Sequence, residues 1–414
     1  MDGQHASSFF AIPIELRRAV YAHLLSTAGQ HIQYITGDDG IHHFRLTPCI
    51  VSAKWDEEEL DGTERNPDKL YWVWGPIYKR RLSSSWGPHW MCEELAFNLP
   101  VCEHAHWKGS STQEAGDIAP ASLRGFASAL RVCKRMYMEL VEEATTGTDF
   151  HVTDLRTLKA MLDHRAPAPA PYSFEGSICP CISKLSITLS LPLAFFQAIE
   201  AVVYRASPDW EIASTSDIED NSVGTWLHLH SRLLIQLPKL RKLRVWLDHN
   251  NDSYWSVVDE RAILAPMEAL RTSNPSLELV CVLPKLHPRI EDRQRHYLSV
   301  DVDEEEESPS RLVVHRFMRQ RYRVVEDRDT GDKTVTIVPD FPVLYKHPLF
   351  DGRPLLDVED YERALWRSGL DVRQHFMWLR PLSTDSPEFT SSGTEHEVND
   401  QSPASYTYRI FSSN

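Results

Sequence analysis

The side chains best suited to chemistry lie in the stretch 91–107, MCEELAFNLPVCEHAHW. It holds two thiols and two imidazoles, a ligand set that binds Zn²⁺ in many proteins, at Cys92, Cys102, His104 and His106. A Cys-x-His-x-His arrangement on a strand sends its three side chains to one face. The Cys-x-x-Cys pair of many zinc sites is absent from this stretch, so buried cysteines and surface histidines are the alternative. On this basis we expect no cofactor.

No catalytic motif accompanies these residues. The chain has no Walker-type glycine loop, no Gly-x-Gly-x-x-Gly, no Gly-x-Ser-x-Gly and no His-Glu-x-x-His. We therefore predict no catalytic residues and a protein that is not an enzyme. One further alternative is a zinc-binding protein or enzyme built on the aromatic-rich stretch 51–108, whose tryptophans would form either the core of an irregular insertion or the wall of a ligand site. Those tryptophans are Trp55, Trp72, Trp74, Trp86, Trp90 and Trp107.

The N-terminal stretch 9–25, FFAIPIELRRAVYAHLL, would present an interaction surface. Pro13 suits the first turn of a helix, where its missing N–H costs nothing, and Glu15 complements the helix dipole. Apolar residues then recur at helical spacing. The pattern predicts a helix with one apolar face, which either binds an adaptor protein or completes the core. The residues of that face are Ile12, Pro13, Leu16, Val20 and Leu24.

The order apolar, Pro, apolar, Glu, Leu resembles the opening of an F-box, which reads Leu-Pro-x-Glu-Leu and docks a Skp-type ubiquitin-ligase adaptor. It resembles more closely the opening of a large fungal family of uncharacterised F-box-like proteins. The run from Leu130 to Tyr137 is similar to that family's Leu-x-x-Cys-Arg-x-x-Tyr helix, with Lys134 in place of the arginine, and an aromatic strand follows. The resemblance implies a non-catalytic interaction or scaffold protein. The alternative is a substrate receptor of a cullin-type ubiquitin ligase.

The middle of the chain alternates strand and helix patterns. Strands are predicted at 182–191, 240–247 and 277–283, and helices at 193–204, 226–234 and 257–270, the last interrupted at Pro266. Such alternation implies right-handed crossovers and a mostly parallel sheet. The strand register resembles that of leucine-rich repeats, although the spacing is not that of a regular solenoid. The predicted fold class is α/β with a repeat-like strand–helix layer.

Composition shifts divide the chain into six parts. They are an F-box-like helix (1–29), an aromatic-rich irregular or β insertion (30–120) that opens with two short strands at 31–50, a helical segment with the family signature (121–165), the repeat-like α/β layer (172–300), an acidic loop with a β-hairpin and a C-terminal helix (301–380), and a disordered tail (381–414). We expect the acidic run 301–310 to neutralise the arginines that follow it, from Arg311 to Arg323.

The formal charge of −15 and the pI near 5.7 exclude a general affinity for nucleic acid or anionic membranes. The first residues, MDGQHASSFF, lack the basic start and apolar run of a signal peptide. Seven cysteines, an odd number, favour reduced thiols over a disulfide framework. We expect an intracellular protein, cytoplasmic or nuclear, that binds a protein partner and no membrane.

Overall fold

The computed structural model of the 414-residue chain describes residues 8–24, 29–37, 40, 42–51, 84–97, 134–163, 179–205, 220–251, 253–298, 312–326, 333–350, 353–375 and 406–409. The acidic run 301–310, and residues 121–133 and 164–165 of the helical segment with the family signature, lie outside these ranges.

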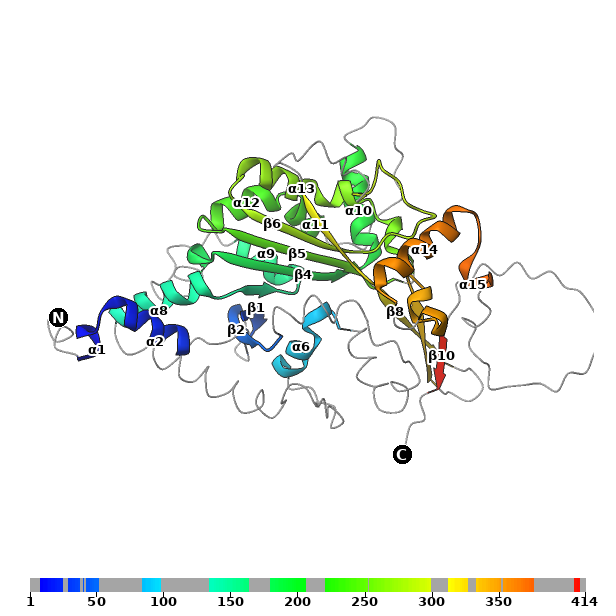
Figure 1. Ribbon diagram of the computed structural model, residues 1–414. Helices are drawn as coiled ribbons and strands as arrows, with labels where there is room; N and C mark the ends of the chain where they lie inside the picture. The colour runs from blue at the N-terminus through cyan, green and yellow to red at the C-terminus, as the bar shows by residue number, and fades with distance from the viewer. Residues whose placement is uncertain are drawn as a thin grey trace, which may run out of the picture.

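A seven-stranded sheet forms the centre of the molecule, in the order β2-β1-β3-β4-β5-β6-β7 (Figure 1). Only the β1–β2 pair is antiparallel, and the other five neighbouring pairs are parallel. This arrangement confirms the predicted α/β fold with a mostly parallel sheet. The strands are β1 (Gly29–Thr36), β2 (His42–Cys49), β3 (Phe150–Val152), β4 (Lys184–Leu191), β5 (Lys242–His249), β6 (Glu278–Pro284) and β7 (Val313–Phe317).

One face of this sheet carries the main apolar core. Every second residue of the central strands points to it, so that Leu185, Leu243 and Leu279 lie side by side across β4, β5 and β6. The helices of the layer cover this face because their apolar stripes need a buried surface. They are α9 (Leu155–Asp163), α10 (Leu193–Arg205), α11 (Asp220–Leu227), α12 (Leu229–Gln236) and α13 (Glu260–Ser273).

Helix α13 corrects one expectation. We predicted an interruption at Pro266, but the helix is continuous from Glu260 to Ser273 with Pro266 inside it. A proline in a helix interior loses one backbone hydrogen bond and costs about 3 kcal/mol. Pro266 is itself buried in the packed face of the helix, and the side chain of Asp259 caps the N-terminus by accepting from the Ala262 N–H (2.9 Å). Core packing therefore outweighs the local preference.

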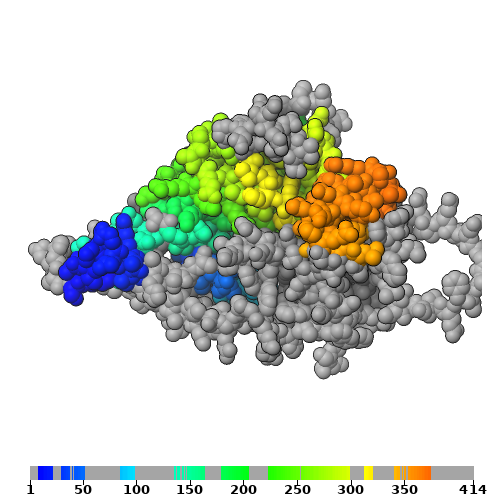
Figure 2. All heavy atoms as spheres, in the orientation of Figure 1, coloured from blue at the N-terminus to red at the C-terminus, as the bar shows by residue number. Residues whose placement is uncertain are grey.

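The N-terminal helices lie at the narrow end of the molecule, where α1 (Ser8–Ala11) and α2 (Ile14–Leu24) pack beside α8 (Lys134–Gly147) (Figures 1 and 2). The contact is polar. Arg17 Nε donates to Glu139 Oε2 (2.8 Å), and the Tyr21 hydroxyl donates to the same oxygen (3.0 Å). Arg17 and Tyr21 are both buried. The buried side of α2 is therefore formed by these two residues.

The C-terminal part forms a second, smaller core. A three-stranded antiparallel sheet consists of β8 (Gln320–Glu326), β9 (Lys333–Pro339) and β10 (Tyr406–Arg409), and its β8–β9 pair confirms the β-hairpin predicted within 301–380. Four residues of the predicted disordered tail thus form a strand, and the rest of 381–414 lies outside the described ranges. Helices α14 (Leu355–Arg367) and α15 (Val372–His375) pack on a cluster that includes Phe341, Leu344 and Trp366.

Candidate metal centre

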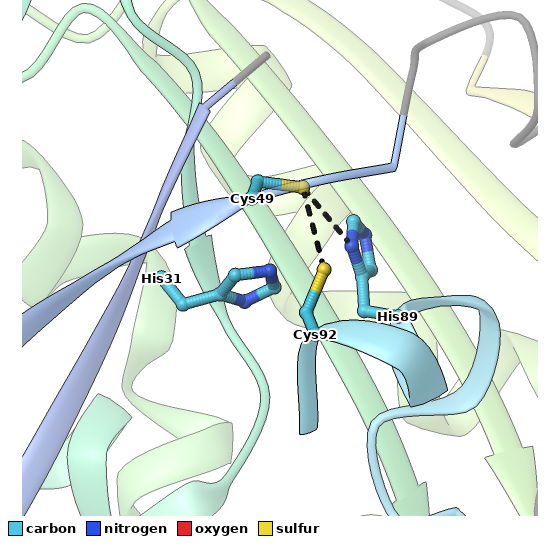
Figure 3. Close-up of side chains that lie close together, drawn as sticks. All are labelled: His31, Cys49, His89 and Cys92. Atoms are coloured by element: carbon cyan, nitrogen blue, oxygen red, sulfur yellow. Dashed lines mark hydrogen bonds between the residues drawn. The ribbon is translucent and has the colours of Figure 1, made fainter. Parts of the chain in front are cut away.

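Four potential metal ligands converge beneath the antiparallel edge of the main sheet (Figure 3). One ligand atom from each of four side chains lies within 4.8 Å of the other three, and all four side chains are buried. Two are imidazoles and two are thiols, which is a usual ligand set for a structural Zn²⁺. The residues are His31, Cys49, His89 and Cys92.

The β1–β2 hairpin positions the first two ligands. His31 pairs with Thr47 across the hairpin, so Cys49 lies two residues further along β2 and points to the same face. Ile32, next to His31, points to the opposite face and belongs to the main core. The face that carries the ligands is thus the one that the layer helices do not cover.

A short helical segment brings the other two ligands against this face. It consists of η2 (Gly87–His89) and α6 (Trp90–Ala96), so His89 and Cys92 lie three residues apart, about one turn of helix. Gly87 has φ +53, and a Cβ there would come within 2.8 Å of the Trp246 ring on β5. Only glycine allows both this backbone conformation and this close approach.

Polar contacts fix both ends of the segment. At its start, Glu93 accepts hydrogen bonds from the hydroxyls of Ser84 (2.6 Å) and Ser85 (3.0 Å). At its end, Arg45 Nη2 donates to the carbonyl of Ala96 (2.7 Å), while its Nε donates to Gln33 of β1 (3.0 Å). The Arg45–Ala96 hydrogen bond therefore attaches the segment to the hairpin without involving the four ligands.

The spacing of the ligand atoms fits a tetrahedral zinc site. Zn–S and Zn–N bonds of about 2.3 and 2.0 Å at tetrahedral angles place two sulfurs about 3.8 Å apart and a sulfur and a nitrogen about 3.5 Å apart. Cys49 Sγ lies 3.8 Å from Cys92 Sγ and 3.5 Å from His89 Nδ1. Both of these edges match the tetrahedron, and the other ligand atoms lie within 4.8 Å of one another, so small side-chain shifts would complete the coordination.

The electrostatics also suit a divalent cation. Burial raises the pKa of the Cys92 thiol, but hydrogen bonds from Cys49, His31 and His89 and the charge of His31 outweigh it, so the pKa lies well below its ordinary value. The backbone N–H of Ile50 donates to Cys92 Sγ (3.4 Å), an interaction that favours a thiolate. Two thiolates with Zn²⁺ and two neutral imidazoles would carry no net charge, which a buried site requires.

Aromatic rings enclose the cluster. The Trp86 indole stacks on the His31 ring, with ring centroids 4.8 Å apart. His151, the neighbour of His31 on β3, lies 4.5 Å from the His89 ring and 5.0 Å from the His31 ring. Burial, and then the charges of His89, His31 and Arg244, hold the pKa of His151 well below its ordinary value, so it is neutral. His151 thus borders the site as an uncharged ring.

The alternative zinc set in the sequence included one of these four residues, although the expectation was no cofactor. Cys92 belongs to the cluster, whereas Cys102, His104 and His106 lie outside the described residues. His31, Cys49 and His89 were missed. The available signal was the His-x-x-Cys spacing of His89 and Cys92, which places two ligands on one helical turn as a Cys-x-x-Cys pair does. The hairpin register that brings in His31 and Cys49 had no sequence motif.

The predicted apolar face of the N-terminal helix lies mostly outside the core. Leu16 is 58% exposed and Val20 42% exposed, Pro13 is exposed and Ile12 is half-buried. Leu24 is in α2, but its side chain is not among those the structure describes. The helix meets α8 through Arg17 and Tyr21, one position away from Leu16 and Val20 along the helix.

Two general findings complete the description. Within the described ranges, every helix is too short or too polar to cross a membrane. Comparison of the chain with protein-family models, with curated proteins and with solved structures found no match, so the functional conclusion is drawn from the chain's own geometry.

Proposed function

We propose that this protein binds one structural zinc ion through His31, Cys49, His89 and Cys92 and acts through protein contacts, without catalysis. The observation that carries the proposal is the convergence of two thiols and two imidazoles, with ligand atoms within 4.8 Å of one another. Thiolate and imidazole ligands in tetrahedral arrangement select zinc over the hard cations, which prefer oxygen.

The closed character of the site supports a structural role. A catalytic zinc keeps one position open for water or substrate, whereas a structural zinc has four protein ligands. Here four protein ligands are available, and each side chain is at most 3% exposed. The ion would fasten α6 to the β1–β2 hairpin, and so hold the described part of the tryptophan-rich insertion on the sheet.

The direct test is metal analysis of the purified full-length chain. We expect about one equivalent of zinc per chain, a lower melting temperature after chelation, and recovery when zinc is returned. Cobalt should replace zinc and give the visible spectrum of a tetrahedral thiolate–imidazole site. Protein that is metal-free when isolated from zinc-supplemented medium, takes up no zinc and melts unchanged with a chelator would reject the proposal.

Two matched variants test whether loss of the metal is specific to Cys92 or follows the removal of any thiol. Cys92→Ser should lose the metal. Cys181→Ser should keep it, because Cys181 accepts a hydrogen bond from Lys239 (3.6 Å) and is not part of the cluster. Equal metal content in both variants would contradict the assignment of Cys92 as a ligand.

A second candidate function is supported by α2. Leu16 and Val20 form an exposed apolar pair on a helix that is held to α8 by the neighbouring Arg17 and Tyr21. This is the arrangement that an adaptor-docking helix needs, and it agrees with the F-box-like opening of the sequence. The corresponding role is a substrate receptor that binds a Skp-type adaptor. Co-purification of the chain with such an adaptor tests it.

A further inference from the structure

We propose that Cys49 and Cys92 are also a modification site: without zinc they form a disulfide with each other, and this disulfide blocks zinc binding. The inference rests on the zinc site proposed above. It assigns two alternative states to one pair of sulfur atoms, which bind either the ion or each other.

The geometry of the pair supports this assignment. The two Sγ atoms lie 3.8 Å apart, at van der Waals contact. A disulfide requires about 2.0 Å between sulfurs. A rotation about one Cα–Cβ bond moves a sulfur atom by more than this difference. Cys49 ends β2 and Cys92 is in the first turn of α6, so the bond would join the same two elements that zinc joins.

Polar contacts surround both sulfur atoms. Thiol–disulfide exchange requires a thiolate, because the thiol itself is a poor nucleophile. His89 Nδ1 lies 3.5 Å from Cys49 Sγ, and the Ile50 N–H donates to Cys92 Sγ (3.4 Å), an interaction that favours a thiolate. With zinc present, the imidazole and both sulfurs would be coordinated, and neither sulfur could attack.

A small-molecule disulfide such as oxidised glutathione completes the chemistry. The Cys49 thiolate attacks one glutathione sulfur, forms a mixed disulfide and releases one glutathione thiolate, which takes up the proton. The Cys92 thiolate then attacks Cys49 Sγ and releases the second glutathione. The two protein thiols lose two electrons and two protons, and oxidised glutathione becomes two thiols.

Burial determines when this exchange can occur. Cys49 and Cys92 are 3% and 2% exposed, so an oxidant reaches them only when α6 opens from the hairpin. Zinc would suppress that opening because it binds the closed state alone. The centre should therefore load zinc only while its thiols are reduced, and the loaded form should resist oxidation.

The test compares zinc-loaded and zinc-stripped full-length protein, each treated with oxidised glutathione. A Cys102→Ser background is used because trypsin leaves Cys92 and Cys102 together in the peptide 82–108, whereas Cys49 lies in 46–54. We expect the stripped protein to lose two hydrogen atoms and to yield a crosslink between these two peptides. It should then bind no zinc until a reductant is added, while the loaded protein keeps its zinc and both free thiols.

Three results would overturn the inference: glutathione adducts without the crosslink, a crosslink of either cysteine to a different one, or undiminished zinc uptake by the crosslinked protein. A different result would reject the proposed zinc site itself: reduced protein that takes up no zinc at all. Cys181→Ser on the same background serves as a folded control, and its crosslink should form as in the parent.

Discussion

The main sheet buries polar side chains in two regions, and these regions differ in how the buried polar groups find hydrogen-bond partners. Near β5–β7, Arg319 is buried and donates to Asp248 Oδ1 (2.6 Å), the Ser253 carbonyl (2.7 Å) and Asp340 Oδ2 (3.3 Å). Beneath β1–β3, two thiols and three imidazoles are buried together, and both ring nitrogens of His151 and Nε2 of His89 have no hydrogen-bond partner among the described residues. In the first region, groups of the protein itself accept the hydrogen bonds of Arg319. The second has the composition of a site that an ion completes.

The difference shows which buried polar groups indicate a bound ligand and which do not. A charge that is fully paired within the chain contributes to the uniqueness of the fold and carries no sign of a ligand. Glu260 is such a group, since it accepts from Trp255 Nε1 (2.7 Å), Arg316 Nη2 (2.8 Å) and the Tyr297 N–H (3.0 Å). Side chains that converge at coordination distances while nearby nitrogens remain unsatisfied point to a ligand.

Two of the arginines expected to pair with the acidic run have other partners, while the run itself lies outside the described residues. We predicted that the acidic run 301–310 would neutralise Arg311 to Arg323. Arg316 instead pairs with Glu260 on α13, and Arg319 pairs with Asp248 and Asp340. Their partners come from other elements because β7 enters the sheet beside β6, which leaves Arg316 half-buried on the strand and Arg319 buried two residues beyond its end. Burial favours the partners that are already fixed there.

The largest loss of stability is expected near β5–β7, where Arg319 is paired within the protein. Arg319→Met should destabilise the fold by about 3 to 5 kcal/mol, because it removes the buried guanidinium that the half-buried Asp248 and the buried Asp340 share. Urea denaturation measures the change. The exposed pair of Arg18 and Glu142 (3.4 Å) offers the control: Arg18→Met should change stability by less than about 0.5 kcal/mol. Similar losses of stability in the two variants would contradict the special role of the buried Arg319.

The next effect concerns the zinc ligands. With free zinc at about 100 times its dissociation constant, the ion contributes about 2.7 kcal/mol to folding. Chelation should remove this stabilisation from the wild type and from Arg319→Met alike, but not from Cys92→Ser, which would already lack the ion. Denaturation curves of the three proteins, each with and without chelator, check this expectation. A chelator effect that persists in Cys92→Ser would place the metal elsewhere.

A smaller effect should arise beside the site, at Gly29. A Cβ on Gly29 would lie 2.5 Å from His151 Nε2 and 2.7 Å from the Asp149 carbonyl oxygen. Gly29→Ala should therefore cost about 1 to 3 kcal/mol and weaken zinc binding, because His151 would be pushed toward His31 and His89. Gly224 in α11 has nothing within 4 Å of such a Cβ, so Gly224→Ala should stabilise by about 0.5 to 1 kcal/mol. Thermal melting and zinc titration of both variants decide the point.

The smallest effect on stability is expected at the tip of the molecule. Leu16→Asp should change the free energy of unfolding by less than about 0.5 kcal/mol, because Leu16 is 58% exposed and its helix is held by Arg17 and Tyr21. If α2 docks a Skp-type adaptor, the same variant should lose co-purification with it. Tyr21→Asp, which places the charge in the buried contact with α8, should melt early. A large stability loss in Leu16→Asp would assign that residue to the core.

The sequence by itself determined the α/β layer. Strands β4, β5 and β6 were predictable because their burial follows from local apolar patterns, as at Leu185, Leu243 and Leu279. Cysteine and histidine content raised zinc only as an alternative, with Cys92 among its four candidate ligands, and the expectation was no cofactor. These features are encoded within a few neighbouring residues, where periodicity and residue type are informative.

Only the tertiary structure decided which residues meet. His31 and Cys49 become neighbours of His89 and Cys92 through the β1–β2 register and the docking of α6, which unite segments up to 61 positions apart in the numbering, from His31 to Cys92. The same holds for α2, whose buried side is set by Arg17 and Tyr21 meeting Glu139, 122 and 118 residues away. Such contacts depend on packing between distant elements, which no local spacing records.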